Sequence, residues 1–280
     1  MTHAAPGRAT LATALRHAAD LGLVRLDAQM LLLQALGRTP HDRAWLLAHD
    51  GDLLDAATHT RFDAALRRRL QGEPLAYITG QQEFYGLDLQ VDARVLCPRA
   101  DTETLVDWAL QILPPAAQIV DLGTGSGAIA LAIQHQRPDV RVHARDFSAN
   151  ALAVAQANAQ RLNLNVVFSQ GEWLQGLDGP WDAIVSNPPY IAAADAHLAA
   201  LTHEPLQALA SGTDGLDDLR TIIGQAGERL KPGGWLLLEH GYDQASAVCD
   251  LLRSSGFGEV QSRRDLAGIA RCSGGHWTGT

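Results

Sequence analysis

The sequence predicts an α/β fold in which a doubly wound sheet follows a small helical domain. From Pro98 onward, short apolar segments alternate with helical patterns, and this alternation is typical of a parallel sheet covered by helices. Before residue 83, apolar side chains recur mainly at helical spacing. The chain has 280 residues, which is enough for one large domain and one small domain.

Three segments are expected along the chain. Residues 1–83 are predicted to form an N-terminal helical domain. Residues 84–97 are predicted to form a connecting β-hairpin, because apolar residues alternate there around Gly86. Residues 98–280 carry the alternating pattern and form the α/β domain. The helical patterns of the first segment cover residues 11–19, 27–36 and 60–70, and the last two end near Gly and Pro residues.

Seven strands are expected in the α/β domain. The link between the last two is short, so one of them is expected to run antiparallel. Ligands bind open α/β sheets at the carboxyl ends of strands, and a site is therefore expected at that edge. The predicted strands cover residues 118–121, 140–146, 166–170, 182–186, 235–240, 258–262 and 268–272, and the main helices between them cover 149–162 and 217–230.

The composition limits the possible functions. The net charge is −9, from 22 basic and 31 acidic residues, which disfavours a protein whose main task is to bind nucleic acid. No apolar run reaches membrane-spanning length and residues 1–8 lack a signal-peptide pattern, so a cytoplasmic protein without a membrane partner is expected. No metal site is predicted, because Cys97, Cys249 and Cys272 are far apart and no second pair supports Cys272 and His276 as ligands.

A glycine-rich turn after the first of these strands predicts a cofactor site. Alternating glycines let the backbone turn tightly and approach a ligand, and the helix that follows offers free N–H groups. The next strand ends in Asp146, 23 residues after Gly123, where a carboxylate can accept hydrogen bonds from both ribose hydroxyls. The turn comprises Gly123, Thr124, Gly125, Ser126 and Gly127, and Asp121 precedes it.

A second motif, Asn187-Pro188-Pro189-Tyr190, ends the strand at 182–186. Two consecutive prolines cannot continue a sheet, so they leave a rigid turn at the carboxyl end of the strand. The Asn187 oxygen and a proline carbonyl can accept both N–H bonds of a planar amino group, and the Tyr190 ring can pack on its face. The turn resembles the NPPY motif of methyltransferases that modify planar nitrogens, which are either exocyclic base amines or glutamine side-chain amides. The alternative interpretation is an ordinary turn that ends a strand.

Together these motifs resemble the release factor glutamine methyltransferases, whose catalytic domain is a class I methyltransferase with a seven-stranded sheet and an antiparallel last strand. The resemblance runs from about residue 72 to the C-terminus, while the first 70 residues match only as a small helical domain. Its remaining motifs are Gly72-Glu73-Pro74-Leu75-Ala76-Tyr77-Ile78-Thr79-Gly80, Glu83-Phe84-Tyr85-Gly86, Pro98-Arg99, Asp101-Thr102-Glu103, Val185 to Ile191 and Leu236-Leu237-Leu238-Glu239-His240-Gly241.

The resemblance implies methylation of the glutamine in the Gly-Gly-Gln motif of class-1 peptide chain release factors. The donor would be S-adenosylmethionine, the products N5-methylglutamine and S-adenosylhomocysteine, and the helical domain would dock the substrate. The resemblance also implies how S-adenosylmethionine is held. Gly123 to Gly127 would surround its methionine part, and Asp121 would face its amino-acid half. Asp146 would bind the ribose, and Trp173 would lie beside the adenine. Asn187 would contact both the cofactor and the target glutamine. The substrate pocket would be completed by Pro188, Pro189 and Tyr190. The catalytic residues would be Asn187, Pro188 and Tyr190.

The sequence departs from the family pattern at Ala100, where Pro is common, and at Cys97, where an aliphatic residue is common. Residues 191–215 form a long Ala-rich segment that is a plausible lid. Three alternatives stay open: a ribosomal-protein glutamine methyltransferase, an adenine-N6 DNA methyltransferase, and a cofactor-binding adaptor. The motifs at 72–86 favour the release factor enzyme, and the acidic charge argues against a nucleic-acid substrate.

Overall fold

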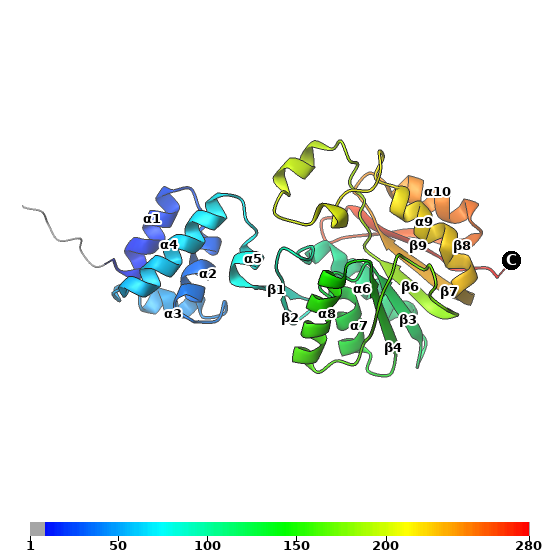
Figure 1. Cartoon of the computed structure of the whole chain (residues 1–280), viewed down its shortest axis with the longest axis horizontal. Helices are drawn as coiled ribbons and strands as arrows, with labels where there is room; N and C mark the ends of the chain where they lie inside the picture. The colour runs from blue at the N-terminus through cyan, green and yellow to red at the C-terminus, as the bar shows by residue number, and fades with distance from the viewer. Residues whose placement is uncertain (1–8, 280) are drawn as a thin grey trace, which may run out of the picture. The chain divides into compact units, whose positions relative to one another are not determined.

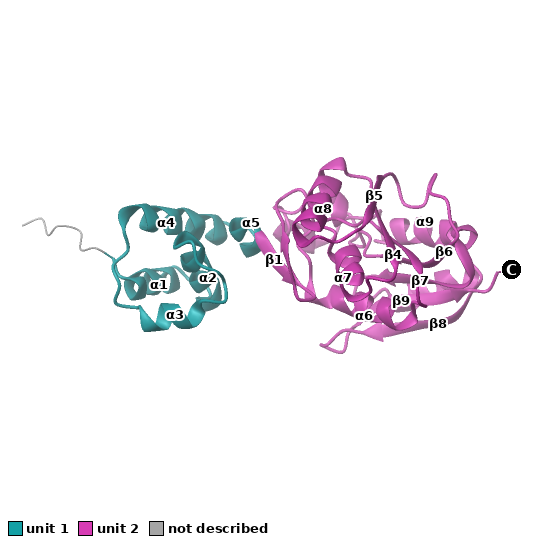
Figure 2. Cartoon of the chain, turned by 90° about the horizontal axis from the view of Figure 1, so that it is seen from below, with its two compact units in different colours: residues 1–80 teal, residues 81–280 magenta. Residues whose placement is uncertain are grey.

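The computed structural model describes residues 9–279 and divides the chain into two compact units, Met1–Gly80 and Gln81–Thr280 (Figure 2). The predicted domain boundary at residue 83 falls inside the first strand of the second unit, β1 (Gln81–Phe84). The predicted connector is therefore part of the second unit rather than a separate segment. Residues 1–8, whose sequence predicts no signal peptide, lie outside the described residues.

The described part of the first unit is helical, as expected. Two of its helices begin at capped residues: the Thr10 side chain accepts the Thr13 N–H at 3.2 Å, and the Asp55 side chain accepts the Thr58 N–H at 2.9 Å. The helices are α1 (Leu11–Asp20), α2 (Arg25–Ala35), α3 (Arg43–Ala48), α4 (Ala56–Leu70) and α5 (Leu75–Thr79). The short helices α3 and α5 were not predicted, because each is too brief to show a clear period.

The predicted hairpin forms at the start of the second unit. Strand β1 pairs antiparallel with β2 (Leu87–Gln90), and the turn between them places Tyr85 and Gly86 at φ values of 52° and 78°. The Asn158 side chain accepts the Gln90 N–H at 2.7 Å and donates to the Gln90 carbonyl at 2.9 Å. This pair of bonds ties the hairpin to helix α8 (Ala149–Leu162).

The second unit contains a seven-stranded sheet with the order β5-β4-β3-β6-β7-β9-β8. Strand β9 runs antiparallel to both of its neighbours, which confirms the predicted fold class. The strands are β3 (Gln118–Leu122), β4 (Arg141–Asp146), β5 (Val167–Gln170), β6 (Trp181–Ser186), β7 (Leu230–Glu239), β8 (Phe257–Arg264) and β9 (Ala270–Trp277).

Helices cover both faces of the sheet (Figure 1). Val120, Ile184 and Leu236 share one face and form a core with α9 and α10, whereas α6 and α7 contact the same strands from the other side. These helices are α6 (Glu103–Ile112), α7 (Ala128–Gln136), α9 (Asp217–Ala226) and α10 (Ala245–Ser254), and the 3₁₀ turns are η1 (Ala100–Thr102), η2 (Ala196–Ala200), η3 (Leu206–Ala208) and η4 (Gly227–Arg229).

Three predicted elements have wrong boundaries. The strand expected over 235–240 is β7, which covers Leu230–Glu239. The helix expected over 217–230 ends at Ala226, because η4 tightens its last turn and β7 already begins at Leu230. The strand expected over 268–272 instead extends from Ala270 to Trp277. The prediction ended too early because the glycines at 274 and 275 resemble a turn in the sequence. In the structure, a Cβ at Gly274 would lie 2.6 Å from the Leu236 carbonyl oxygen, so close strand packing requires glycine there.

Candidate active site

A cavity of about 380 Å³ opens at the carboxyl ends of β3, β4, β5 and β6. These strands are parallel neighbours, so the segments that follow them meet at one edge of the sheet. Six predicted site residues line the cavity, namely Gly123, Gly125, Asp146, Trp173, Asn187 and Pro189. The other predicted site residues, Asp121, Thr124, Ser126, Gly127, Pro188 and Tyr190, do not line it.

The glycine-rich turn depends on backbone conformations that other residues rarely adopt. Gly123, Gly125 and Gly127 have φ values of +69°, +57° and +86°. A Cβ at Gly127 would also lie 2.9 Å from the Leu131 Cδ1 atom. The N–H groups of Gly123 and Thr124 both donate to the Arg145 carbonyl, at 2.8 and 3.0 Å, which anchors the turn on β4. The predicted turn therefore exists, and two of its three glycines expose backbone to the cavity.

Asp146 lies at the wall of the cavity, and two backbone hydrogen bonds hold its carboxylate in a fixed orientation. Its Oδ2 accepts the Gly125 N–H at 2.9 Å, and its Oδ1 accepts the Ser148 N–H at 2.8 Å. Burial raises the pKa of this carboxyl, while the two backbone hydrogen bonds partly offset the shift. Each carboxylate oxygen has more than one lone pair, so both retain the capacity to accept a further hydrogen bond from a ligand hydroxyl.

Asp121 lies beneath the turn and is fully buried. Its Oδ2 accepts the Thr124 hydroxyl at 2.6 Å and the Ala130 N–H at 3.3 Å, while its Oδ1 has no hydrogen-bond partner among the described residues. Burial raises the pKa of Asp121 to about 7. A buried oxygen without a partner is unusual in a folded protein and is consistent with a polar ligand at this turn.

Trp173 belongs to a tightly held segment, residues 171–175. Its backbone has a φ of 40°, and its Nε1 donates to the Asp218 Oδ1 at 3.2 Å. The Arg145 Nη2 donates to the Gln175 carbonyl at 2.6 Å from the other side. Arg145 and Asp218 also line the cavity, and both were missed in the sequence because their partners are distant along the chain. The Trp173 ring is thereby fixed in the cavity wall.

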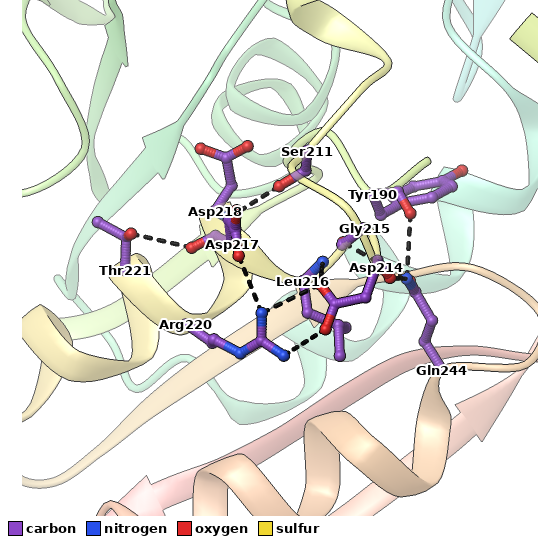
Figure 3. Close-up of polar contacts among 10 residues, drawn as sticks. All are labelled: Tyr190, Ser211, Asp214, Gly215, Leu216, Asp217, Asp218, Arg220, Thr221 and Gln244. Carbon is purple, nitrogen blue, oxygen red and sulfur yellow. Dashed lines mark hydrogen bonds and ion pairs between the residues drawn. The ribbon is translucent and has the colours of Figure 1, made fainter. Parts of the chain in front are cut away.

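The Asn187-to-Tyr190 turn is held through side chains and backbone alike. The Asn187 Nδ2 donates to the Thr102 Oγ1 at 3.2 Å, while its Oδ1 makes no hydrogen bond within the described part of the chain. The Tyr190 N–H donates to the Leu209 carbonyl at 3.2 Å, and the Tyr190 carbonyl accepts the Gln244 Nε2 at 3.0 Å (Figure 3). Burial raises the pKa of the Tyr190 phenol. The Asn187 amide thus presents a free acceptor beside the cavity.

The segment 191–215 closes on itself and borders the cavity. The Ser211 N–H donates to the Ile191 carbonyl at 2.9 Å, so the two ends of the segment meet. Glu204 is buried, where it forms an ion pair with Arg99 and accepts the Cys97 N–H at 3.2 Å. The neighbouring residues Pro205, Gln207 and Ala208 line the cavity.

The structure also bears on metals and membranes. The described residues contain no group of three or more His, Cys, Asp or Glu side chains that could hold a metal ion. No helix of residues 9–279 is both long and apolar enough to span a membrane.

Comparisons with known proteins indicate the class of protein. Residues 102–214 match the Methyltransferase small domain family, and residues 10–80 match the PrmC N-terminal domain family. A solved structure, the 16S rRNA N2 G1207 methyltransferase RsmC of Thermus thermophilus in complex with AdoMet and guanosine, shares the fold with a TM-score of 0.51. That match is 17% identical and covers 70% of this chain and 49% of the other. The fold and the site therefore define a methyltransferase.

Sequence similarity to known methyltransferases shows to which family within this class the chain belongs. The release factor glutamine methyltransferase of Bordetella pertussis is 51% identical over 264 residues, covering 92% of this chain and 97% of the relative. The release factor glutamine methyltransferase of Coxiella burnetii is 48% identical over 251 residues, covering 88% and 90%. The chain belongs to the release factor glutamine methyltransferase family.

Proposed function

We propose that this protein transfers a methyl group from S-adenosylmethionine to the side-chain nitrogen of the glutamine in the Gly-Gly-Gln motif of class-1 peptide chain release factors. The products are N5-methylglutamine and S-adenosylhomocysteine. The observation that carries the proposal is the position of Asn187 at the wall of the cavity that also contains Gly123, Gly125 and Asp146. A planar amide and a nucleoside can therefore be held side by side.

The cavity residues fit S-adenosylmethionine. Asp146 offers two carboxylate oxygens for the ribose hydroxyls, and Trp173 and Phe147 offer aromatic surface for the adenine. The Gly123 and Gly125 backbone allows close approach of the methionine part, and the buried Asp121 oxygen without a partner suits a polar group beside it. When bound, the cofactor supplies an electrophilic methyl group on a sulfonium.

The residues of the Asn187-to-Tyr190 turn can compensate for the weak nucleophilicity of the substrate amide nitrogen. The lone pair of an amide nitrogen is delocalised into its carbonyl group. We assign the Asn187 Oδ1 and the Pro188 carbonyl to accept the two N–H bonds of the substrate, which orients that lone pair. These hydrogen bonds strengthen as positive charge develops on nitrogen, so they stabilise the transition state more than the ground state. The alkylated nitrogen is acidic and releases a proton to water, so no side-chain base is required.

Gly-Gly suits an approach to this turn, because residues without side chains let a loop come close to it. We assign Pro189 and Tyr190 to enclose the glutamine, and the helical unit to provide a second docking surface. Removal of residues 1–80 should then leave cofactor binding intact but lower turnover on a folded release factor. Equal turnover for the full and shortened chains would reject the docking role.

The substrate assignment is tested with labelled S-adenosylmethionine and purified release factors, followed by peptide mass mapping. The label should appear on the glutamine of Gly-Gly-Gln, and a release factor with alanine in place of that glutamine is the matched control. Label in a ribosomal protein or in DNA adenine would reassign the substrate. Absence of label from every candidate would reject the proposed activity.

A further inference from the structure

The Gln244 side chain lies where three backbone segments meet beside the substrate turn. Its Oε1 accepts the Gly241 N–H at 2.8 Å. Its Nε2 donates to the Tyr190 carbonyl at 3.0 Å (Figure 3) and lies 3.4 Å from the carbonyl oxygens of Asp214 and Gly215. Gln244 therefore joins the loop that follows β7 to both ends of the segment that borders the cavity.

The backbone partners determine the orientation of the Gln244 amide. A backbone N–H group only donates and a carbonyl oxygen only accepts, so the Gly241 N–H requires the amide oxygen and the Tyr190 carbonyl requires the N–H₂ group. The reversed amide would set oxygen against oxygen and N–H against N–H. One N–H bond is directed to Tyr190, which leaves the other for the carbonyls of Asp214 and Gly215.

The backbone around Gln244 is closely packed. Gly215 has a φ of +76°, and a Cβ there would lie 2.2 Å from the Tyr190 carbonyl oxygen and 2.7 Å from the Gln244 Nε2 atom. On the other side, the Nδ1 of the fully buried His240 donates to the Gly241 carbonyl at 2.9 Å. The amide thus connects a fixed loop to backbone that leaves no space for a side chain.

We propose that Gln244 is a positioning residue that holds the Asn187-to-Tyr190 turn and segment 191–215 in place against the cavity. This inference rests on the function proposed above and identifies what anchors the target end of the site. Gln244 does not line the cavity, so it acts through the backbone that it binds. The turn and the segment both contribute residues to the cavity wall, so displacement of either changes the alignment of the substrate amide.

Gln244→Glu distinguishes hydrogen bonding from packing, because it preserves size and shape. The introduced carboxylate still accepts the Gly241 N–H, but its second oxygen opposes the Tyr190 carbonyl. A protonated carboxyl can donate to that carbonyl again, so activity should recover as the pH falls. Gln244→Met is similar in size and has no N–H group, so its loss of activity should not depend on pH in this way.

Few charged groups surround this position. Asp243 precedes it in the chain, His240 lies behind Gly241, and Asp214 is paired with Arg220. All of these groups are also present in the wild-type protein. The ratio of variant to wild-type kcat therefore isolates the titration of the introduced carboxyl.

The test measures kcat and KM with a release factor at saturating cofactor, at pH 8 and pH 6. Gln244→Met should lower kcat roughly tenfold, as for loss of a buried hydrogen bond, and Gln244→Glu should lower it on the order of 100-fold at pH 8, as for a misplaced substrate. The ratio of Gln244→Glu to wild-type kcat should rise at least about threefold at pH 6. The matched control is Gln156→Glu, which is exposed on α8, does not line the cavity and should match wild type at both pH values.

Backbone hydrogen exchange gives a readout that does not depend on activity. The N–H groups of Tyr190 and Ile191 donate to the Leu209 carbonyl at 3.2 and 2.9 Å, and the Ser211 N–H donates to the Ile191 carbonyl at 2.9 Å. These three N–H groups should exchange roughly tenfold faster in Gln244→Met than in the wild-type protein.

S-adenosylmethionine affinity, measured by calorimetry, should stay near the wild-type value in both variants. Wild-type kcat in Gln244→Met, or unchanged exchange at the three N–H groups, would overturn the proposal. Equal losses in Gln244→Met and Gln244→Glu at both pH values would indicate a packing role, and a parallel loss of cofactor affinity would indicate a general folding defect. If the wild-type protein methylates no release factor, the proposed function fails, while hydrogen exchange still decides whether Gln244 anchors the turn.

Discussion

The cofactor end and the target end of the cavity are built by different means. At the cofactor end, the turn from Gly123 to Gly127 obtains its shape from backbone conformations with positive φ, and backbone N–H groups orient Asp146. At the target end, the side chains of Thr102 and Gln244 hold the Asn187-to-Tyr190 turn from distant parts of the chain. The cofactor end is a local structure, whereas the target end depends on long-range contacts.

This difference predicts that substitutions at the two ends of the cavity affect different quantities. A substitution at the cofactor end should appear mainly in cofactor affinity, because its side chains bind ground state and transition state alike. A substitution at the target end should appear mainly in kcat, because its contacts strengthen as charge develops on the substrate nitrogen. The four predictions below test this separation, starting from the largest effect.

Asn187→Ala should give the largest effect. The variant loses the side-chain acceptor assigned to the substrate N–H bond, and loss of such a contact typically costs about 10²–10³ in rate. Single-turnover kinetics with a release factor measure the change, and calorimetry should show a much smaller change in S-adenosylmethionine affinity. The matched control is Asn150→Ala, because Asn150 is exposed on α8 and does not line the cavity. Near-normal turnover would remove Asn187 from the mechanism.

Asp146→Ala should act in the opposite way. Loss of a charged acceptor costs about 1.5–3 kcal/mol per hydrogen bond, so S-adenosylmethionine affinity should fall by at least roughly 10- to 100-fold, the loss expected for one of the two bonds. The rate at saturating cofactor should change less, and calorimetry measures the affinity. Asp178→Ala is the control, because Asp178 is exposed and does not line the cavity. Unchanged affinity would place the ribose elsewhere.

The pH dependence of cofactor binding tests the cofactor end by itself. Burial raises the pKa of Asp121 to about 7, so its carboxylate becomes protonated as the pH falls through that value. Asp121 lies beneath the glycine-rich turn, where its Oδ2 accepts the Thr124 hydroxyl. S-adenosylmethionine affinity should therefore fall between pH 8 and pH 6, because the negative charge beneath the turn is lost.

The kinetic readout and a matched variant complete this test. Protonation of Asp121 should leave kcat at saturating cofactor unaffected, because the residue lies beneath the cofactor turn and does not line the cavity. An Asp121→Asn protein should lose the pH dependence of cofactor affinity, and an unchanged profile in this variant would assign the titration to another group.

Arg220→Ala should give the smallest effect. Arg220 forms ion pairs with Asp214 and Asp217 where segment 191–215 returns to α9, and the side chains are 43%, 46% and 62% exposed (Figure 3). Exposed pairs contribute about 0–1 kcal/mol, so unfolding free energy and kcat should change little. Gln244→Ala is the comparison, because it removes a contact to the Tyr190 carbonyl and should lower kcat more. A larger loss in Arg220→Ala would mean that the exposed end of the segment controls the turn.

Most of the fold could be predicted from the sequence. The strands at 118–122 and 181–186 were located to within one residue, because an apolar run is followed there by glycines or prolines that end a strand. The boundaries of β7 and β9 were misplaced, because glycines within these strands resemble turns. Glycine can mark either a turn or close packing, and only the neighbouring strand distinguishes the two.

The sequence by itself determined the glycine turn, the position of Asp146, the proline-ended strand and the order of strand and helix, since residues adjacent in the chain specify each of them. Only the tertiary structure decided that Asp121 lies behind the cavity, that Trp173 is fixed by Asp218, and that Asn187 is hydrogen-bonded to Thr102. These partners are 45 and 85 residues apart for Trp173 and Asn187. Side-chain hydrogen bonds at such separations follow from packing of whole elements, and no local pattern specifies them.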